Sequence, residues 1–278
     1  MTSAVFSIIC VYNDEGILNN WLLAGLKDQT RGFELIKVDN TGGAFKSAAE
    51  ALNYGAKNAK GEYLMFIHQD VRLISEDWPA RAEKFLRDMR DLGVAGVAGM
   101  VKTKNPGMIS FGTIPTDNRV WEIYHGHKKE LSVYNRILSG CPAEVQTLDE
   151  QLLLAPRKVF GELKFDGAAC PGWHLYAVDY ALSVKKLGLK AYVLPLPVWH
   201  MSNGNINRGY YAALINVLKK HREEKAIYTT CGLWHTSRFV NCLSLFFLAV
   251  RGELGRWVGR NDRGGGFYMA RLKMFLGI

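Results

Sequence analysis

The first 70 residues alternate between strand-like and helix-like patterns, and this alternation constrains the fold more than any other feature. Apolar, β-rich runs at 4–11, 33–38 and 63–67 are separated by helical patterns at 15–27 and 46–59. Strands and helices that alternate in this way form a mostly parallel sheet with right-handed crossovers. We therefore expect an α/β protein whose central sheet is mostly parallel and flanked by helices.

Each of these three strands ends in polar residues, namely Tyr12-Asn13-Asp14, Asp39-Asn40 and His68-Gln69-Asp70. Parallel order brings all three ends to one edge of the sheet, where open α/β sheets bind their ligands. The pattern therefore predicts a ligand site at this edge. Local roles are the alternative: Asp70 caps the following helix, and turn chemistry accounts for Tyr12 and Asp39.

Two further polar residues follow apolar segments far along the chain. Asp179 lies in a helical pattern at 174–187, and His200 lies between an extended run at 190–196 and the turn Ser202-Asn203-Gly204. Two carboxylates and an imidazole suit a divalent cation and a general base. Mg²⁺ or Mn²⁺ would take oxygen ligands from Asp70 and from a substrate diphosphate, and Mn²⁺ accepts an imidazole ligand better than Mg²⁺.

Composition sets the class of protein and suggests its surroundings. The 278 residues suit one large domain or a domain with an appendage. The five cysteines form no C-x-x-C pair, and a signal-peptide pattern is lacking, so we expect a reducing, cytoplasmic setting. Residues 205–278 hold 12 Lys and Arg against four Asp and Glu, which favours contact with an anionic membrane surface or an anionic acceptor.

The order of these features resembles the inverting family 2 glycosyltransferases, which have a GT-A fold with a Rossmann-like sheet. The resemblance covers residues 4–204. It rests on the three polar strand ends, on the run from Asn53-x-Gly55 to Gly61-Glu62-Tyr63, and on the late Asp179 and His200. The variants His68-Gln69-Asp70-Val71 and Trp173-His174-x-Tyr176-x-x-Asp179 resemble a bacterial and archaeal subgroup described as glycosyltransferase-like.

The resemblance implies a role for each matching position. Tyr12 would stack on the nucleobase, Asp39 would bind the base or ribose, and Asp70 would ligate the metal that bridges the donor diphosphate. Asp179 would be the catalytic base, and His200 a second metal ligand. The remaining expected site residues are Asn13, Asn40 and Gln69 for the donor, Trp173, His174 and Asp149 for the acceptor, and His68 as a possible further metal ligand.

Three positions depart from the pattern of that family. His68 stands where the first carboxylate of Asp-x-Asp is usual, so metal binding is weaker or His68 takes its place. Val178 replaces an acidic residue before the expected base. Leu52 replaces an arginine before Asn53, which leaves phosphate neutralisation to the metal or to a basic residue such as Lys46.

We therefore expect a GT-A catalytic domain at 1–204 and a basic, amphipathic helical region at 205–278. The expected function is inverting, metal-dependent transfer from a nucleotide sugar, most simply a UDP-sugar, to a glycan or glycolipid acceptor at the inner membrane face. The C-terminal helices would dock there peripherally, through Lys219, Lys220, Arg222, Arg251, Arg256, Arg260, Phe247 and Trp257.

The alternatives are a sugar nucleotidyltransferase and a degenerate protein that binds nucleotides or nucleic acid. The first lacks the expected Gly-rich, basic loop after the first strand, where Tyr12-Asn13-Asp14-Glu15 stands instead. The second lacks a nucleic-acid-binding motif, so no nucleic acid is expected as a partner.

Overall fold

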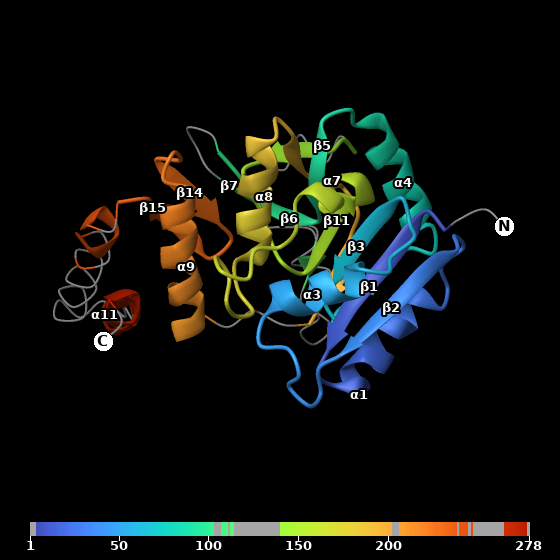
Figure 1. The fold of residues 1–278 in the computed structure, drawn as a ribbon, viewed down its shortest axis with the longest axis horizontal. Coiled ribbons are helices and arrows are strands. Elements are labelled where there is room, and N and C mark those ends of the chain that lie inside the picture. The colour runs from blue at the N-terminus through green and yellow to red at the C-terminus, as the bar shows by residue number, and fades with distance from the viewer. Residues whose placement is uncertain are drawn as a thin grey trace.

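The computed structural model describes residues 4–102, 107–110, 112–113, 140–201, 206–237, 239–243, 246 and 264–276 (Figure 1). The strands are β1 (Phe6–Tyr12), β2 (Phe33–Asp39), β3 (Tyr63–Ile67), β4 (Val71–Leu73), β5 (Leu92–Gly96), β6 (Ala98–Val101), β7 (Gly107–Ser110), β8 (Gly112–Thr113), β9 (Ala143–Val145), β10 (Thr147–Leu148), β11 (Leu152–Pro156), β12 (Lys190–Val193), β13 (Val198–His200), β14 (Ala226–Thr229) and β15 (Gly232–His235). The helices are α1 (Glu15–Leu18), the π-helix η1 (Asn19–Leu23), α2 (Ala24–Leu26), α3 (Ala48–Ala56), α4 (Trp78–Asp88), α7 (Arg157–Glu162), α8 (Tyr176–Lys186), α9 (Arg208–Lys220) and α11 (Gly264–Leu276).

The central sheet has seven strands in the order β2-β1-β3-β11-β5-β12-β9. β1 pairs in parallel with β2 and β3, and β12 pairs in parallel with β5. β11 runs antiparallel to both β3 and β5, so β5 and β12 point the same way as β1. Five strands are thus parallel, and the expected mostly parallel α/β sheet is confirmed.

Helices cover both faces of this sheet because its strands are apolar on both sides. In β3, Leu64 and Phe66 pack in the core beneath α3, α7 and α8, whereas Met65 and Ile67 pack beneath α4 and the helical segment 15–26. This alternation has the period of two that a strand requires. It makes β3 a rigid, fully buried support for the polar residues that follow it.

The Asn53-x-Gly55 pattern has a packing role in α3. A side chain at Gly55 would approach Ile9 Cγ2 to 2.7 Å and Val38 Cγ2 to 2.8 Å, so glycine lets α3 lie close to β1 and β2. Asn53 exchanges two hydrogen bonds with the backbone of Phe165, at 2.9 and 3.2 Å. The pattern therefore positions α3 and the segment before α8. The residues at the predicted ligand edge are the polar strand ends.

A small sheet, β4-β13-β8, brings the distant His200 to Asp70. β13 runs antiparallel to β4, with His200 opposite Val71, and the N–H of Met201 donates to the carbonyl of Asp70 over 3.1 Å. Backbone pairing thus joins positions 70 and 200, which are 130 residues apart.

Some parts of the chain change course over few residues. The consecutive strands β5 and β6 belong to different sheets although only Val97 separates them. The region 205–278 is expected to be helical, but after α9 it contains the hairpin of β14 and β15. α11 begins at Gly264, the first of three consecutive glycines.

The start of the C-terminal region packs with the rest of the fold. Tyr211, Leu214 and Val217 of α9 lie in the same hydrophobic core as Tyr180 of α8, and the two helices lie side by side (Figure 1). No helix among the described residues has the length and apolarity needed to span a membrane. The boundary at residue 204 stays a prediction.

Candidate active site

The carboxyl ends of β1, β2 and β3 border a cavity of about 610 Å³. Seven of the expected site residues line it: Tyr12, Asn13, Asn40, His68, Gln69, Asp70 and Trp173. Thr41, Phe45, Lys46 and Tyr176 also line it. Parallel strand order therefore brings the three polar strand ends together, as the sequence predicted.

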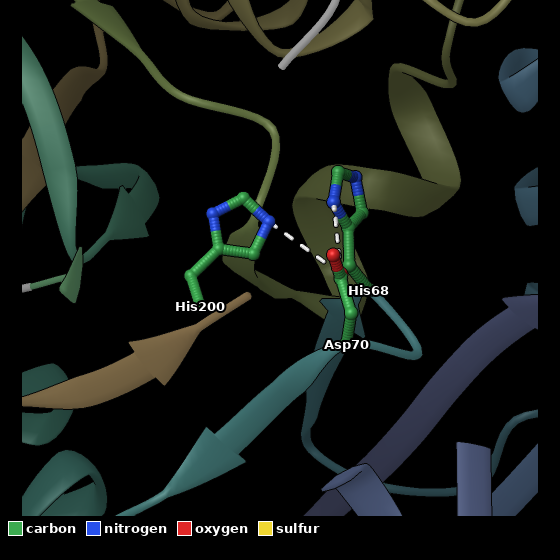
Figure 2. Close-up of side chains that lie close together, drawn as sticks. All are labelled: His68, Asp70 and His200. Atoms are coloured by element: carbon green, nitrogen blue, oxygen red, sulfur yellow. Dashed lines mark ion pairs between the residues drawn. The ribbon is translucent and has the colours of Figure 1, made fainter. Parts of the chain in front are cut away.

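His68, Asp70 and His200 form a compact group of potential metal ligands (Figure 2). His200 Nε2 lies 3.5 Å from Asp70 Oδ1, and His68 Nδ1 lies 3.9 Å from the same oxygen. One ligand atom from each residue lies within 4.8 Å of the others. Two imidazoles and one carboxylate suit Mn²⁺ better than Mg²⁺, because Mg²⁺ prefers oxygen ligands.

The surroundings of His68 keep its imidazole ready to bind a cation. Burial and the neighbouring His200 lower the pKa of His68 to about 4, although the carboxylates of Asp70 and Asp149 act in the opposite direction. His68 is therefore neutral near pH 7, and only a neutral imidazole carries the lone pair that a metal requires.

Gln69 and Asn13 line the cavity but are bonded to each other. Gln69 Oε1 accepts hydrogen bonds from the backbone N–H groups of Asn13 and Asp14, at 3.0 and 3.1 Å. Gln69 Nε2 donates to Asn13 Oδ1 over 2.6 Å. These two side chains join the ends of β1 and β3, so their first role in this structure is to hold the cavity wall.

Asn40 shapes the loop after β2 in a similar way. Its Oδ1 accepts a hydrogen bond from the N–H of Phe45 at 2.8 Å, and its Nδ2 donates to the carbonyl of Phe45 at 3.3 Å. The same loop brings Lys46 to the cavity, where its Nζ donates to the carbonyl of Gly43 over 3.0 Å. The sequence named Lys46 as a candidate for phosphate neutralisation, and the structure places this cation in the cavity wall.

Asp39 lies beside the cavity, next to Tyr12 in the strand register. Its Oδ1 accepts hydrogen bonds from the backbone N–H and the hydroxyl of Thr41, both at 2.8 Å, and these bonds lower the pKa of Asp39. The pKa of Tyr12 is raised, first by burial and second by the charge of the nearby Asp39. Asp39 is therefore a fixed, charged acceptor beside an aromatic wall.

Asp179, the expected catalytic base, lies elsewhere. It is 2 % exposed and does not line the cavity. His221 Nε2 lies 2.8 Å from its Oδ1, and Lys220 Nζ lies 2.8 Å from its Oδ2. Both oxygens are thus bonded to the end of α9, which differs from the expectation that Asp179 faces an acceptor hydroxyl.

The turn before β11 brings Asp149 and Glu150 close to the metal-ligand group. The N–H of His68 donates to the carbonyl of Gln151 over 3.1 Å, so this turn lies beside the end of β3. Asp149 accepts hydrogen bonds from the Thr230 hydroxyl at 2.8 Å and from the Gln151 N–H at 3.2 Å. Burial, and then the charge of Asp149, raise the pKa of Glu150 to about 8.

The two other expected acceptor residues differ in exposure. Trp173 is 42 % exposed and lines the cavity, so it is accessible to a ligand. His174 packs edge-on against Tyr210 with 5.9 Å between the ring centroids, and burial lowers its pKa. His174 therefore has a packing role beside α9.

Residues 8–224 match the family described as "Glycosyltransferase like family". This chain belongs to that family. The match includes all three polar strand ends, Asp179, His200 and the whole of α9. A comparison with curated proteins returns no match.

Solved glycosyltransferases share the fold at low sequence identity. One is the mannosyltransferase PcManGT from Pyrobaculum calidifontis in complex with GDP-Man and Mn²⁺, with a TM-score of 0.51, 15 % identity, and coverage of 81 % of this chain and 66 % of that chain. Another is GalNAc-T7 with UDP, GalNAc and Mn²⁺, with a TM-score of 0.51, 16 % identity, and coverage of 77 % and 48 %. This glycosyltransferase-like chain thus has the expected GT-A fold. It spans about two thirds of the length of the first protein and about half of the second.

Tyr176 is the site residue that sequence reasoning missed. No role at the site was assigned to it from the sequence, yet it lines the cavity and its hydroxyl lies 3.0 Å from His68 Nε2. Its place in the motif Trp173-His174-x-Tyr176 was the available signal, because Trp173 was already expected at the site.

Proposed function

We propose that this protein is an inverting, metal-dependent glycosyltransferase. In this proposal it moves a sugar from a nucleotide-sugar donor, specifically a UDP-sugar, to a hydroxyl group of a glycan or glycolipid. The observation that carries the proposal is the His68–Asp70–His200 group beside the cavity at the ends of β1, β2 and β3. The nucleotides and Mn²⁺ bound by the two similar solved structures support it.

The cavity has the size and lining for such a donor. Its volume of about 610 Å³ falls within the usual range for small-molecule sites. Tyr12 offers an aromatic wall for a base and Asp39 an acceptor for ribose or base, while Lys46 supplies positive charge for the phosphates. A divalent cation held by Asp70, His200 and His68 would stabilise the negative charge on the leaving nucleoside diphosphate.

Asp149 is our candidate for the general base. Inverting transfer needs a carboxylate that takes the proton of the attacking hydroxyl. Asp179 is bonded to Lys220 and His221, and Glu150, with a pKa of about 8, is largely protonated at neutral pH. Asp149 is half-buried, and its charge acts on the neighbouring His68. Its oxygens accept from the uncharged Thr230 hydroxyl and Gln151 N–H, whereas the oxygens of Asp179 are held by Lys220 and His221.

The donor and the stereochemistry are tested by two linked measurements. Thermal unfolding is followed with a panel of UDP-, GDP- and other nucleotide sugars, each with and without Mn²⁺. A UDP-sugar that stabilises the protein only with Mn²⁺ would then be incubated with glycan and glycolipid acceptors, and NMR would give the anomeric configuration of the product. Retained configuration, or release of pyrophosphate from a nucleoside triphosphate and a sugar phosphate, would contradict the proposal.

We also propose peripheral binding to an anionic membrane through the C-terminal region. Phe239, Val240, Leu243 and Phe246 are 74, 37, 41 and 47 % exposed, which is unusual for large apolar side chains in a solvated helix. Lys220 is not available as first expected, because it bonds to Asp179 and Asp166. The other expected contacts from Phe247 to Arg260 lie outside the described residues.

Co-sedimentation with vesicles tests this second proposal. Vesicles containing phosphatidylglycerol should retain the protein at low salt, whereas phosphatidylcholine vesicles should not. The double variant Phe239→Ser/Phe246→Ser should lose most of this binding. Equal sedimentation of variant and wild type would assign the binding to charge alone.

A further inference from the structure

The hydroxyl of Tyr176 joins two parts of the site. It donates a hydrogen bond to the backbone carbonyl of Glu150 over 3.1 Å, and it lies 3.0 Å from His68 Nε2. A carbonyl oxygen can only accept, so the single hydroxyl proton points toward Glu150. The tyrosine oxygen is then left to accept a proton from His68 Nε2.

This order of donors determines which nitrogen of His68 carries the proton. With Nε2 protonated, the lone pair of His68 lies on Nδ1, which is 3.9 Å from Asp70 Oδ1. With the other tautomer, an Nδ1–H group would face Asp70 across a distance too long for a hydrogen bond. The hydroxyl of Tyr176 would also lose one of its two hydrogen bonds, either the one with His68 or the one with the carbonyl of Glu150.

We propose that Tyr176 is a positioning residue that holds His68 as the Nε2–H tautomer and directs Nδ1 toward the cation site shared with Asp70 and His200. The inference rests on the proposed function, because the cation is the one that would bind the donor diphosphate. This positioning of His68 explains how the chain could bind a cation without the first carboxylate of Asp-x-Asp. A nitrogen held by Tyr176 takes the place of a carboxylate oxygen.

The surroundings of Tyr176 hold the hydroxyl in place. Tyr176 is 4 % exposed, and its ring packs edge-on against Phe165 with 5.3 Å between centroids. Leu175, just before it, has a left-handed backbone with a φ of 65°, and its N–H donates to the Glu150 carboxylate. Glu150 therefore holds Leu175 with its side chain and Tyr176 with its carbonyl, so the start of α8 is bound to the turn before β11.

The donor set has a consequence for the choice of metal. A neutral imidazole in place of a carboxylate makes the site one charge less negative, which weakens Mg²⁺ binding more than Mn²⁺ binding. Hydrogen bonds to the second nitrogen of a ligating histidine orient the ring and strengthen the ligand. Tyr176 supplies that bond here.

Tyr176→Phe removes the hydroxyl and keeps the ring, and Tyr180→Phe is its matched control. Tyr180 lies one turn along the same helix, and its buried hydroxyl has no hydrogen-bond partner among the described residues. ¹H–¹⁵N NMR of the imidazoles reports the tautomer without metal, and electron paramagnetic resonance of free Mn²⁺ reports its affinity. Neither measurement needs a donor or turnover.

We expect His68 in wild type and in Tyr180→Phe to be the Nε2–H tautomer, and in Tyr176→Phe to be a mixture of tautomers. Tyr176→Phe should lower Mn²⁺ affinity about 10-fold or more, which is the usual effect of losing such a partner. His68→Ala should lower it at least as much, and the double variant should lose no more than His68→Ala alone.

Two results would overturn the inference in different ways. Unchanged Mn²⁺ affinity and tautomer in Tyr176→Phe would remove the role of Tyr176 and leave metal-dependent transfer intact. A wild-type protein that binds no Mn²⁺ would remove both this inference and the metal-dependent function proposed above.

Discussion

Gln69 Nε2 donates a hydrogen bond to Asn13 Oδ1 over 2.6 Å and thereby connects the ends of two neighbouring parallel strands. The same Gln69 side chain accepts from the backbone N–H groups of Asn13 and Asp14. Asp14, in turn, caps the following helix by accepting from the N–H of Ile17 at 2.9 Å. One amide side chain thus couples β3, β1 and the first helix at the edge of the cavity.

Gln69→Ala should weaken the fold and the donor site together. It removes three hydrogen bonds at a partly exposed position, so we expect the free energy of unfolding to fall by about 1–3 kcal/mol. The apparent Kd of the donor should rise, because the loop after β1 loses its support. Urea unfolding and donor titration measure the two effects.

Asn58→Ala serves as the control, because its exposed side chain forms no hydrogen bond within the part of the chain that the structure describes. Unchanged donor affinity in Gln69→Ala would show that the Gln69 contacts are dispensable for the cavity.

Removal of the cation should abolish donor binding. A donor at 100 times its Kd stabilises the folded state by about 2.7 kcal/mol, which corresponds to a Tm increase of roughly 5 °C for a chain of this size. A chelator should remove this increase, and Mn²⁺ should restore it at a lower concentration than Mg²⁺.

His200→Ala and Asp70→Asn should behave like the chelated wild type in the same thermal assay. His235→Ala, on the β14–β15 hairpin, is the control and should respond normally to Mn²⁺. A donor that stabilises Asp70→Asn as well as wild type would exclude this cluster as the cation site.

Asp149→Asn and Asp179→Asn should separate catalysis from stability. Loss of a general base costs about 10²- to 10⁴-fold in rate, so Asp149→Asn should lower kcat strongly while donor affinity stays near wild type. Steady-state kinetics at a matched folded fraction would measure this. A larger loss of kcat in Asp179→Asn than in Asp149→Asn would return the base to position 179.

Asp179→Asn should chiefly lower stability. Removing one partner of a buried ion pair costs about 3–5 kcal/mol. We expect the lower end of this range, because Lys220 keeps its 2.8 Å contact with Asp166. Chemical unfolding measures the change, and a stability equal to wild type would contradict the structural role.

Glu224 should make the fold sensitive to acid. Burial raises its pKa, but hydrogen bonds from Lys102 and Lys185 outweigh this and lower the pKa to about 2. Because the folded pKa lies below the ordinary value near 4.5, the stabilisation is complete above pH 4.5 and is lost as the pH falls toward 2.

Glu224→Gln should therefore be less stable than wild type at pH 6, and the difference should shrink between about pH 4.5 and pH 3. Urea unfolding across this range measures the effect. A difference that stays constant with pH would show that the Glu224 charge contributes nothing.

The sequence predicts those parts of the site that follow from chain order and strand direction. Tyr12, Asn40 and Asp70 lie around one cavity because parallel strands place their carboxyl ends at the same edge. His200 could be predicted from its chemistry and from the family resemblance, but not from any local pattern that places it beside Asp70. What brings it to Asp70 is the pairing of β13 with β4, a contact between segments 130 residues apart that no local pattern encodes.

Side-chain partners could not be predicted in the same way. A helical pattern identified α8, but the neighbour that covers Asp179 is α9, and only packing decides that Asp179 faces Lys220 and His221 instead of the cavity. Likewise, a polar strand end indicates a ligand site but does not show that Gln69 is bonded to Asn13.

By itself, the sequence determined the α/β class, the parallel direction of the first three strands and the edge that carries the polar residues, because these follow from local periodicity and from the crossover connections between parallel strands. Only the tertiary structure decided which polar side chains face the cavity and which support it. A side chain of given chemistry bonds to whichever partner the packing brings within about 3 Å. For Asp179 that partner lies on α9, and for His68 it is Tyr176.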